Sequence, residues 1–199
     1  MLYPQLSSKR IILASKSPRR LELIRGLEIE PEVVIRDVDE SYPHSLKGSS
    51  VAEFVTLAKA NAFNDIITEN DVLITGDTVV LLGDDVLGKP QDRREAIQML
   101  EKLSGKTHTV ASGIAVNTVN SGTKCAVDTC EVQFNVLSRE IIEHYIDTYQ
   151  PYDKAGSYGV QDLIGFIGVK SIKGSFYTVM GLPVHILHNM LSELNKRLK

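Results

Sequence analysis

The stretch from Asp71 to Leu82 reads DVLITGDTVVLL, and it decides the fold class. Apolar residues occupy both alternating sets of positions in it, which is typical of a strand that is covered on both faces of a sheet. Residues 83–85 (Gly-Asp-Asp) are a turn signal, and Val86 and Leu87 continue as a short second strand. The sequence therefore predicts a buried central strand that returns in a hairpin.

Helices and strands are mixed on both sides of this stretch. Residues 10–14 predict a short buried strand, after which Ser17 and Pro18 are typical of a helix start. Further strands are expected at residues 32–38, 108–117, 124–136 and 166–172. Further helices are expected from a capping box at Ser50 and Glu53, from a second one at Asp92 and Glu95, from Ser138, and after Pro183. Hairpins together with crossovers predict an α/β fold with a mixed sheet and flanking helices, treated as a single domain over residues 1–199 with two lobes and no internal boundary.

Composition and charge narrow the function classes. The chain has 199 residues, of which 43% are apolar and 24% charged, as in ordinary globular proteins. Its net charge of -3 argues against stable nucleic-acid binding, and no apolar run reaches the length of a membrane span. Cys125 and Cys130 are expected on opposite faces of one strand, so we expect no disulfide between them. These features favour a cytoplasmic protein, for which a homodimer is the usual assembly.

The first turn of the helix after Pro18 carries an unusual pair of cations. Arg19 and Arg20 lie at the positive end of the helix dipole, which destabilises a positive charge there. A bound anion would offset this unfavourable interaction. Together with the hydroxyls of Ser15 and Ser17 they predict a phosphate-binding turn. The alternative is that both arginines are solvated or pair with Glu22 and Asp37.

Asp77 lies inside the apolar central strand, so its carboxylate needs a metal, a cation or a set of donors. A structural salt bridge is the alternative reading. Lys89, between Gly88 and Pro90, and Lys154, in a glycine-containing loop, are candidate phosphate ligands. Glu40 belongs to an acidic segment that could supply oxygens to a hard cation such as Mg²⁺. For Lys154 and Glu40 the alternative is a solvated loop.

Other chemistries lack their motifs. Gly105-Lys106-Thr107 does not complete a phosphate-binding P-loop, since the first glycine of that motif is missing and the segment follows a helix. The sequence contains neither a zinc-ligand pattern nor a nucleophile elbow. Cations on several turns together with carboxylates therefore favour phosphoryl or nucleotidyl chemistry.

Six short segments are spread in order over nearly the whole chain. They are Ser15-Lys16-Ser17-Pro18-Arg19-Arg20, Gly76-Asp77-Thr78-Val79-Val80, Gly88-Lys89-Pro90, Leu103-Ser104-Gly105 with His108, Asp153-Lys154-Ala155-Gly156-Ser157-Tyr158-Gly159-Val160-Gln161, and Gly174-Ser175 with Gly181-Leu182-Pro183. In this order they resemble the motifs of the Maf family of nucleoside triphosphate pyrophosphatases. The resemblance implies an elongated, two-lobed fold shared with inosine triphosphate pyrophosphatases, with the nucleotide in the cleft between the lobes.

The resemblance also implies the reaction and its residues. A nucleoside triphosphate would be hydrolysed between its α- and β-phosphates, with a divalent metal required. Asp77 would be the proton acceptor, and Arg19, Thr78 and Gln161 would set substrate choice. Apart from the resemblance, we predict from the residues themselves that phosphate is bound by Ser15, Ser17, Arg20, Lys89 and Lys154, and that Mg²⁺ or Mn²⁺ is held by Glu40 and Asp77. The residues at the three specificity positions are similar to those of the branch that acts on dTTP and UTP, and a glutamine amide can pair with the imide edge of these bases.

One departure from the family pattern lies on the helix after residue 50. Aligning Leu57-Ala58-Lys59-Ala60-Asn61-Ala62 with the family puts Asn61 where a lysine is usual. Lys59 is about 200° away around a helix, so we expect it not to replace that lysine and phosphate binding to be weakened. This departure leaves open a nucleotide-binding regulator without turnover, linked to septum formation. The same reaction on 7-methyl-GTP or another modified nucleotide is a further alternative.

Overall fold

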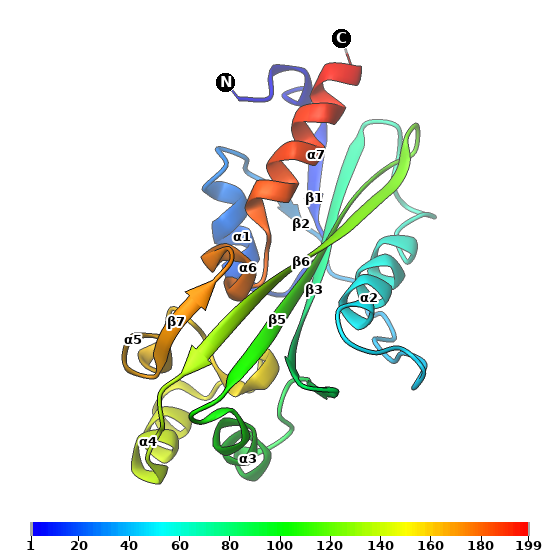
Figure 1. The fold of residues 1–199 in the computed structure, drawn as a ribbon. Helices are drawn as coiled ribbons and strands as arrows, with labels where there is room; N and C mark the ends of the chain where they lie inside the picture. The colour runs from blue at the N-terminus through cyan, green and yellow to red at the C-terminus, as the bar shows by residue number, and fades with distance from the viewer. Residues whose placement is uncertain (1, 199) are drawn as a thin grey trace. The chain divides into compact units, whose positions relative to one another are not determined.

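The structure is a computed structural model that describes residues 2–198 (Figure 1). Its strands are β1 (Arg10–Leu13), β2 (Glu32–Val33), β3 (Asp71–Leu82), β4 (Asp85–Leu87), β5 (Thr107–Thr118), β6 (Gly122–Phe134) and β7 (Val169–Lys173). Its helices are α1 (Pro18–Arg25), α2 (Ser50–Asn61), α3 (Arg93–Leu103), α4 (Arg139–Tyr149), α5 (Leu163–Ile167), α6 (Phe176–Met180) and α7 (Val184–Arg197), with 3-10 turns at Pro4–Leu6 and Ala155–Ser157.

The sheet is mixed, as the sequence predicts. Its strands are hydrogen-bonded in the order β2-β1-β3-β5-β6-β7, and β4 pairs with β3 outside that path. β1 is parallel to β2 and β3, with Ile12 opposite Leu73, whereas β4 is antiparallel to β3 and β7 to β6. β3 covers the predicted range and is buried over nearly all its length, which confirms the double-covered central strand.

The chain divides into two compact units. Unit 1 contains the chain up to Asp77, residues 112–128 and the chain from Gly181 on, and unit 2 contains residues 78–111 and 129–180. Strands β3, β5 and β6 pass from one unit into the other, with the division on β3 between Asp77 and Thr78. Consecutive residues of one strand thus belong to different units.

Unit 1 holds both ends of the described chain together. Ile12, Phe63 and Leu73 form an apolar cluster of this unit. Helix α7 is tied to the N-terminal segment by a hydrogen bond between the Tyr3 hydroxyl and His188 Nδ1, 2.7 Å apart. Its leucines at helical spacing are buried, as predicted for the last helix.

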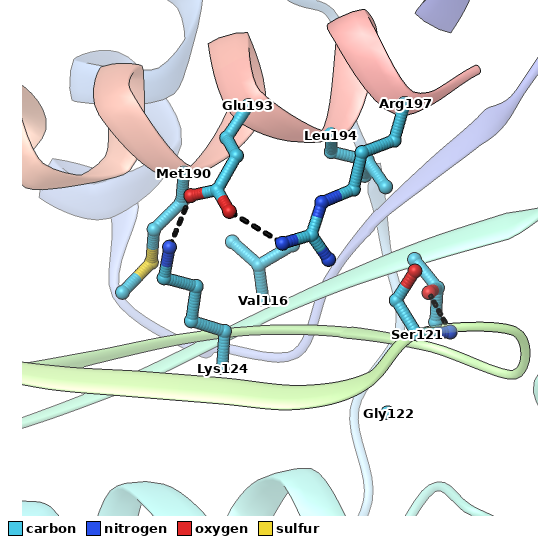
Figure 2. A pocket seen from close by; sticks show the side chains of 9 residues that line it. Val116, Ser121, Gly122, Lys124, Met190, Glu193, Leu194 and Arg197 are labelled. Carbon is cyan, nitrogen blue, oxygen red and sulfur yellow. Dashed lines mark hydrogen bonds and ion pairs between the residues drawn. The ribbon is translucent and has the colours of Figure 1, made fainter.

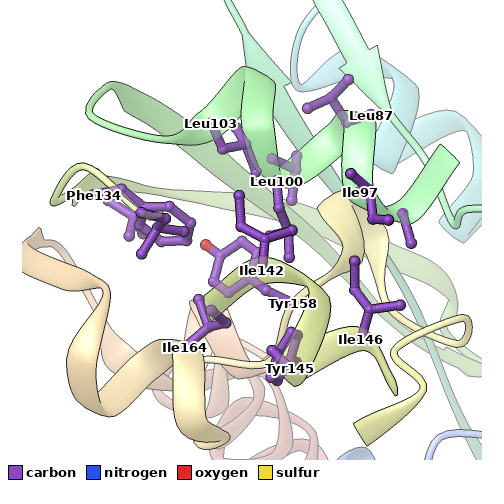
Figure 3. Packing of buried hydrophobic residues seen from close by; sticks show 14 of the residues in the cluster. Leu87, Ile97, Leu100, Leu103, Phe134, Ile142, Tyr145, Ile146, Tyr158 and Ile164 are labelled. Carbon is purple, nitrogen blue, oxygen red and sulfur yellow. The ribbon is translucent and has the colours of Figure 1, made fainter. Parts of the chain in front are cut away.

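Unit 2 has a larger core between α3, α4 and the sheet, shown in Figure 3. Leu100 and Leu103 of α3 and Tyr145 of α4 are fully buried in it. The His108 ring packs edge-on against Phe134 and Tyr158, and its Nε2 lies 2.7 Å from the Tyr158 hydroxyl. Burial lowers the pKa of His108 to about 4, so the imidazole is neutral at pH 7.

The predicted helix caps are right in two cases and wrong in one. Asp92 accepts the backbone N–H of Glu95 at the start of α3, and Ser138 caps α4 in the same way. The capping box expected at Ser50 does not form, because the helix begins one residue earlier and the Ser50 hydroxyl donates to the Lys47 carbonyl at 2.6 Å. The predicted helix is nevertheless present, because burial of its apolar face stabilises it without a side-chain cap.

Two predicted strands are corrected. The strand expected over residues 32–38 is only the two residues of β2, because the ladder with β1 ends where β1 ends. The strand expected over residues 166–172 begins at Val169, since Phe166 and Ile167 are in α5, a short helix that the apolar pattern does not distinguish from a strand. Helix α6 was not predicted.

Two further expectations concern covalent and membrane features. Cys125 and Cys130 are free thiols, as expected. Within residues 2–198, no helix combines the length and the apolar character that crossing a membrane requires.

Candidate functional site

Glycines on neighbouring strands allow two close approaches in unit 1, of β5 to β3 at Gly76 and of helix α2 to β5 at Gly113. A Cβ atom on Gly76 of β3 would lie 2.8 Å from the carbonyl oxygen of Gly113 on β5. A Cβ on Gly113 would lie 2.7 Å from the Ala52 carbonyl and closer still to the Thr56 side chain, both on α2. The missing side chain at Gly113 therefore lets α2 lie close to β5, the neighbour of the strand that carries Asp77.

The close approach brings Lys59 of α2 to Asp77. Lys59 Nζ lies 2.7 Å from Asp77 Oδ1 and 3.0 Å from Glu40 Oε1. The side chains of Lys59 and Asp77 are only 13% and 12% exposed, and that of Glu40 is half-exposed. We call Glu40, Lys59 and Asp77 the carboxylate cluster. The partner that the buried aspartate requires is thus a lysine, shared with a second carboxylate.

The expectation for Asn61 is wrong. Asn61 is the last residue of α2 and is exposed, whereas Lys59 stands on the side of α2 that faces Asp77. Lys59 was expected to lie about 200° around the helix from the site, but it is this residue that reaches Asp77. A lysine of α2 therefore takes part in the carboxylate cluster.

The predicted phosphate-binding turn is built around Ser15 and Arg20. Ser15 Oγ accepts the backbone N–H of Ser17 at 3.2 Å and an Arg20 N–H at 3.3 Å. Arg20 also donates to the Gly181 carbonyl at 2.8 Å. Burial lowers the pKa of Arg20, and the negative charges of Asp77 and Glu40 raise it. The guanidinium is thus held in place and lies in the field of the carboxylate cluster.

Ser17 and Arg19 are the other predicted members of that turn. Ser17 is the N-cap residue of α1 and its side chain makes no cap hydrogen bond. Arg19 is half-buried in the first turn of the helix, and its charge lowers the pKa of Arg20. Asp37, an alternative partner for these arginines, lies 3.3 Å from Lys16.

Unit 2 brings two predicted lysine loops together. The backbone N–H of Gly156 donates to the Gly88 carbonyl at 3.0 Å, so the turn before Lys89 and the loop after Lys154 are adjacent. The Lys154 side chain is only 12% exposed and lies 2.8 Å from Asp153 and 3.8 Å from Asp162. Lys154 is therefore largely buried and ion-paired, which rules out the alternative of a solvated loop lysine. Lys89, in contrast, is exposed.

Thr78 and Gln161 are the predicted specificity residues of unit 2. Thr78 follows Asp77 on β3 and is half-buried. Gln161 ends the loop that begins after α4, and its Oε1 is a buried atom without a hydrogen-bond partner among residues 2–198. Tyr145 and Asp162, which contact this loop, carry no motif and were not predicted.

A cavity elsewhere in unit 1 contains none of the predicted residues. It measures about 50 Å³ and lies between α7 and the β5-β6 hairpin, where Lys124, Glu193 and Arg197 form an ion-pair chain (Figure 2). Pockets for nucleotide-sized ligands are roughly 300 Å³ or more, so this cavity is too small to hold one.

Comparison with known proteins identifies the family. Residues 10–194 match the family described as Maf-like protein. The chain belongs to the Maf family. A relative from Bacteroides thetaiotaomicron, named dTTP/UTP pyrophosphatase, is 49% identical over 95% of this chain and 98% of its own length. A relative from Bacteroides fragilis with the same name is 47% identical over the same shares of both chains.

A solved structure supports the fold of this Maf family member. The Ham1 protein of Staphylococcus aureus matches with a TM-score of 0.53 over 94% of this chain and all of that chain, at 14% sequence identity. The predicted fold class, a mixed α/β sheet with helices, is confirmed by this similarity and by the strand order.

The carboxylate cluster has ligands of the kind that a divalent cation prefers, and it already holds a cation, the Lys59 ammonium. No group of three His, Cys, Asp or Glu side chains that could enclose a metal occurs among residues 2–198. Glu40 and Asp77 nevertheless direct one oxygen each at the same ammonium, which shows that a cation is accommodated between them. Mg²⁺ is commonly held by one or two carboxylates, with water and phosphate oxygens as its other ligands.

Proposed function

We propose that this Maf family member hydrolyses dTTP and UTP between the α- and β-phosphates, giving the nucleoside monophosphate and pyrophosphate. The observation that carries the proposal is the carboxylate cluster, in which a buried aspartate on the central strand is paired with Lys59 and lies in the field of Arg20. The names of the relatives at 49% and 47% identity support the reaction and its substrates.

Asp77 is the proton acceptor in this proposal. A water molecule attacks the α-phosphorus and gives one proton to the Asp77 carboxylate, while the bond from that phosphorus to the bridging oxygen of the β-phosphate breaks. The electron pair of this bond stays on pyrophosphate. Lys59 neutralises part of the negative charge around Asp77 and Glu40, so that a triphosphate can approach.

The cations bind phosphate. Unit 1 supplies the hydroxyls of Ser15 and Ser17 and the guanidinium of Arg20, whose orientation is set by Gly181 and Ser15. Unit 2 supplies Lys89 and Lys154. Fixed donors of this kind stabilise the charge that develops on the pyrophosphate leaving group. Arg19, Thr78 and Gln161 set the choice of substrate.

We propose Glu40 and Asp77 as the protein ligands of Mg²⁺ or Mn²⁺. When bound, the cation would polarise the triphosphate and neutralise its charge. Lys59 would then have to give up some of its contact with these carboxylates. Binding of Mg²⁺ or Mn²⁺ with a substrate analogue that is not hydrolysed, measured by calorimetry for the wild type and Glu40→Gln, tests the ligand set apart from turnover.

The decisive experiment measures pyrophosphate release from dTTP, UTP, CTP, GTP, ATP and 7-methyl-GTP. We expect selective release from dTTP and UTP, and a loss of at least about 10²-fold in kcat for Asp77→Asn, as for removal of a general base. Asp37→Asn is the matched control, because Asp37 is an exposed carboxylate that pairs with Lys16. Retention of a tenth of the activity by Asp77→Asn would rule out its role as base.

The same panel separates the alternatives. Metal-dependent binding of dTTP without any product would favour the nucleotide-binding regulator linked to septum formation. Preferential release from 7-methyl-GTP would favour the other branch of the family. We also propose a cytoplasmic homodimer, which cell fractionation and analytical ultracentrifugation test.

A further inference from the structure

A buried tyrosine of unit 2 ties together two points of the loop that ends at Gln161. The Tyr145 hydroxyl donates to Asp162 Oδ2 at 3.0 Å and accepts the backbone N–H of Gly159 at 3.1 Å. Its ring is fully buried in the core of unit 2 (Figure 3). Burial raises the pKa of Tyr145, so the hydroxyl stays protonated and its proton lies toward the carboxylate. No step of the proposed reaction uses this hydroxyl.

Asp162 occupies a helix N-cap position, but its side chain does not cap the helix. It is the N-cap residue of α5, where an aspartate usually accepts backbone N–H groups of the first turn. Its side chain makes no such bond and instead faces Tyr145, with Lys154 Nζ 3.8 Å from the same oxygen. The carboxylate is therefore directed at the loop rather than at its own helix.

The side chains of Asp162 and Gln161 both lie close to Gly159, on the side where a Cβ atom would be. A Cβ atom on Gly159 would lie 2.4 Å from Asp162 Oδ2 and 3.0 Å from Gln161 Nε2. A carboxylate oxygen attracts the NH₂ end of an amide and repels its oxygen. In the structure Nε2 is the end of the Gln161 amide beside the position that Asp162 Oδ2 also approaches, while Oε1 is a buried atom without a hydrogen-bond partner in the described chain.

We propose that Tyr145 and Asp162 are positioning residues that fix which end of the Gln161 amide is offered to the substrate base. In this proposal the Asp162 carboxylate attracts Nε2, which leaves Oε1 as the acceptor. Uracil and thymine carry a donor at N3, whereas cytosine carries an acceptor there, so this orientation favours UTP and dTTP over CTP and dCTP. The inference rests on the proposed function, because it needs Gln161 to contact the base.

The test measures kcat and KM for UTP and for CTP with the wild type, Tyr145→Phe and Asp162→Asn. Both substitutions keep the side-chain shape and release the amide, since one removes the proton that orients the carboxylate and the other removes the charge. We expect the UTP to CTP ratio of kcat/KM to fall about tenfold in each variant, chiefly through the KM values. An equal loss on both substrates, with the ratio unchanged, would mean that these residues only support the fold.

Tyr149→Phe is the matched control. Tyr149 lies one turn further along α4 and stacks on the Tyr145 ring, with ring centroids 5.1 Å apart, but it is exposed and outside the Tyr145–Asp162 contact. Its substitution should leave the substrate ratio unchanged. A second control repeats Tyr145→Phe in a Gln161→Ala background, where no further change of the ratio is expected if Tyr145 acts through Gln161. A further tenfold change there would overturn the inference.

The two proposals fail in different ways. If the wild-type chain releases no pyrophosphate from any nucleotide, the proposed function is wrong. The dissociation constants of UTP and CTP for the same variants then decide the inference, which requires the wild type to prefer UTP and Tyr145→Phe and Asp162→Asn to lose that preference. If the wild type hydrolyses UTP and both variants keep the wild-type ratio, only the inference is wrong.

Discussion

Lys59 carries the charge balance of the carboxylate cluster, and its removal tests that cluster. In Lys59→Met, Asp77 and Glu40 lose their shared cation and their two negative charges repel a triphosphate. We expect kcat/KM for dTTP to fall at least about 30-fold, which corresponds to about 2 kcal/mol for truncation of a largely buried ion pair. Steady-state pyrophosphate release, with thermal unfolding measured in parallel, checks this expectation.

Asn61→Ala separates the two possible lysine positions. Asn61 is exposed at the end of α2, so this substitution should leave pyrophosphate release unchanged. Loss of activity in Asn61→Ala with activity retained in Lys59→Met would contradict the site geometry.

At this residue scale, the sequence predicted which chemistry-bearing side chains to consider but not all of their contacts. Asp77 was predicted from its apolar surroundings, and the structure gives it a partner of the expected kind. Lys59 was assigned to the wrong side of its helix because an error of two residues reverses the face. Tyr145 could not have been predicted, since a tyrosine within an apolar helical pattern looks like core and only its position in space places its hydroxyl against the loop.

At the scale of elements, the packing of α2 on the sheet depends on Gly113. In Gly113→Ala the new methyl group would meet the Ala52 carbonyl, a backbone atom of α2 that cannot turn away. We expect a loss of about 1–3 kcal/mol in the free energy of unfolding, as for overpacking of a well-packed core. We also expect weaker dTTP hydrolysis, because displacing α2 moves Lys59 from Asp77. Urea unfolding and pyrophosphate release measure the two effects.

Gly88→Ala is the matched stability control for that substitution. A Cβ on Gly88 meets no atom within 4 Å, and its backbone is not in the left-handed region. Its unfolding free energy should stay close to that of the wild type. An equal loss of stability in both variants would show that steric contact with α2 is not the cause.

Elements with a strong pattern were predicted well, and short ones were not. The central strand and helices α3 and α4 follow from apolar periodicity and from side-chain caps at Asp92 and Ser138. β2 and α5 are too short for periodicity to determine, because their extent depends on tertiary contacts such as the end of β1. The bounds of short elements therefore needed the structure.

At the scale of the whole molecule, the two units differ in the groups that respond to acid. In unit 1, Arg10 lowers the pKa of the buried Asp71, so this carboxylate contributes stability above its unfolded pKa of 3.8 that is lost as the pH falls through its folded value. In unit 2, burial lowers the pKa of His108 from 6.5 to about 4, so this group affects stability at a higher pH than Asp71 does. Of these two groups, His108 should therefore lose its contribution to stability first as the pH falls.

The His108 contribution gives a prediction for the pH dependence of stability. The imidazole binds its proton with a pKa near 6.5 when unfolded and about 4 when folded, so between these values the unfolded chain takes up more protons. Stability should be full above pH 6.5 and should fall by about 3 kcal/mol as the pH drops to 4. His108→Gln keeps a hydrogen-bonding group for Tyr158 without the titration, and urea unfolding of this variant should lose that slope. An identical slope in both proteins would assign the acid sensitivity to other groups.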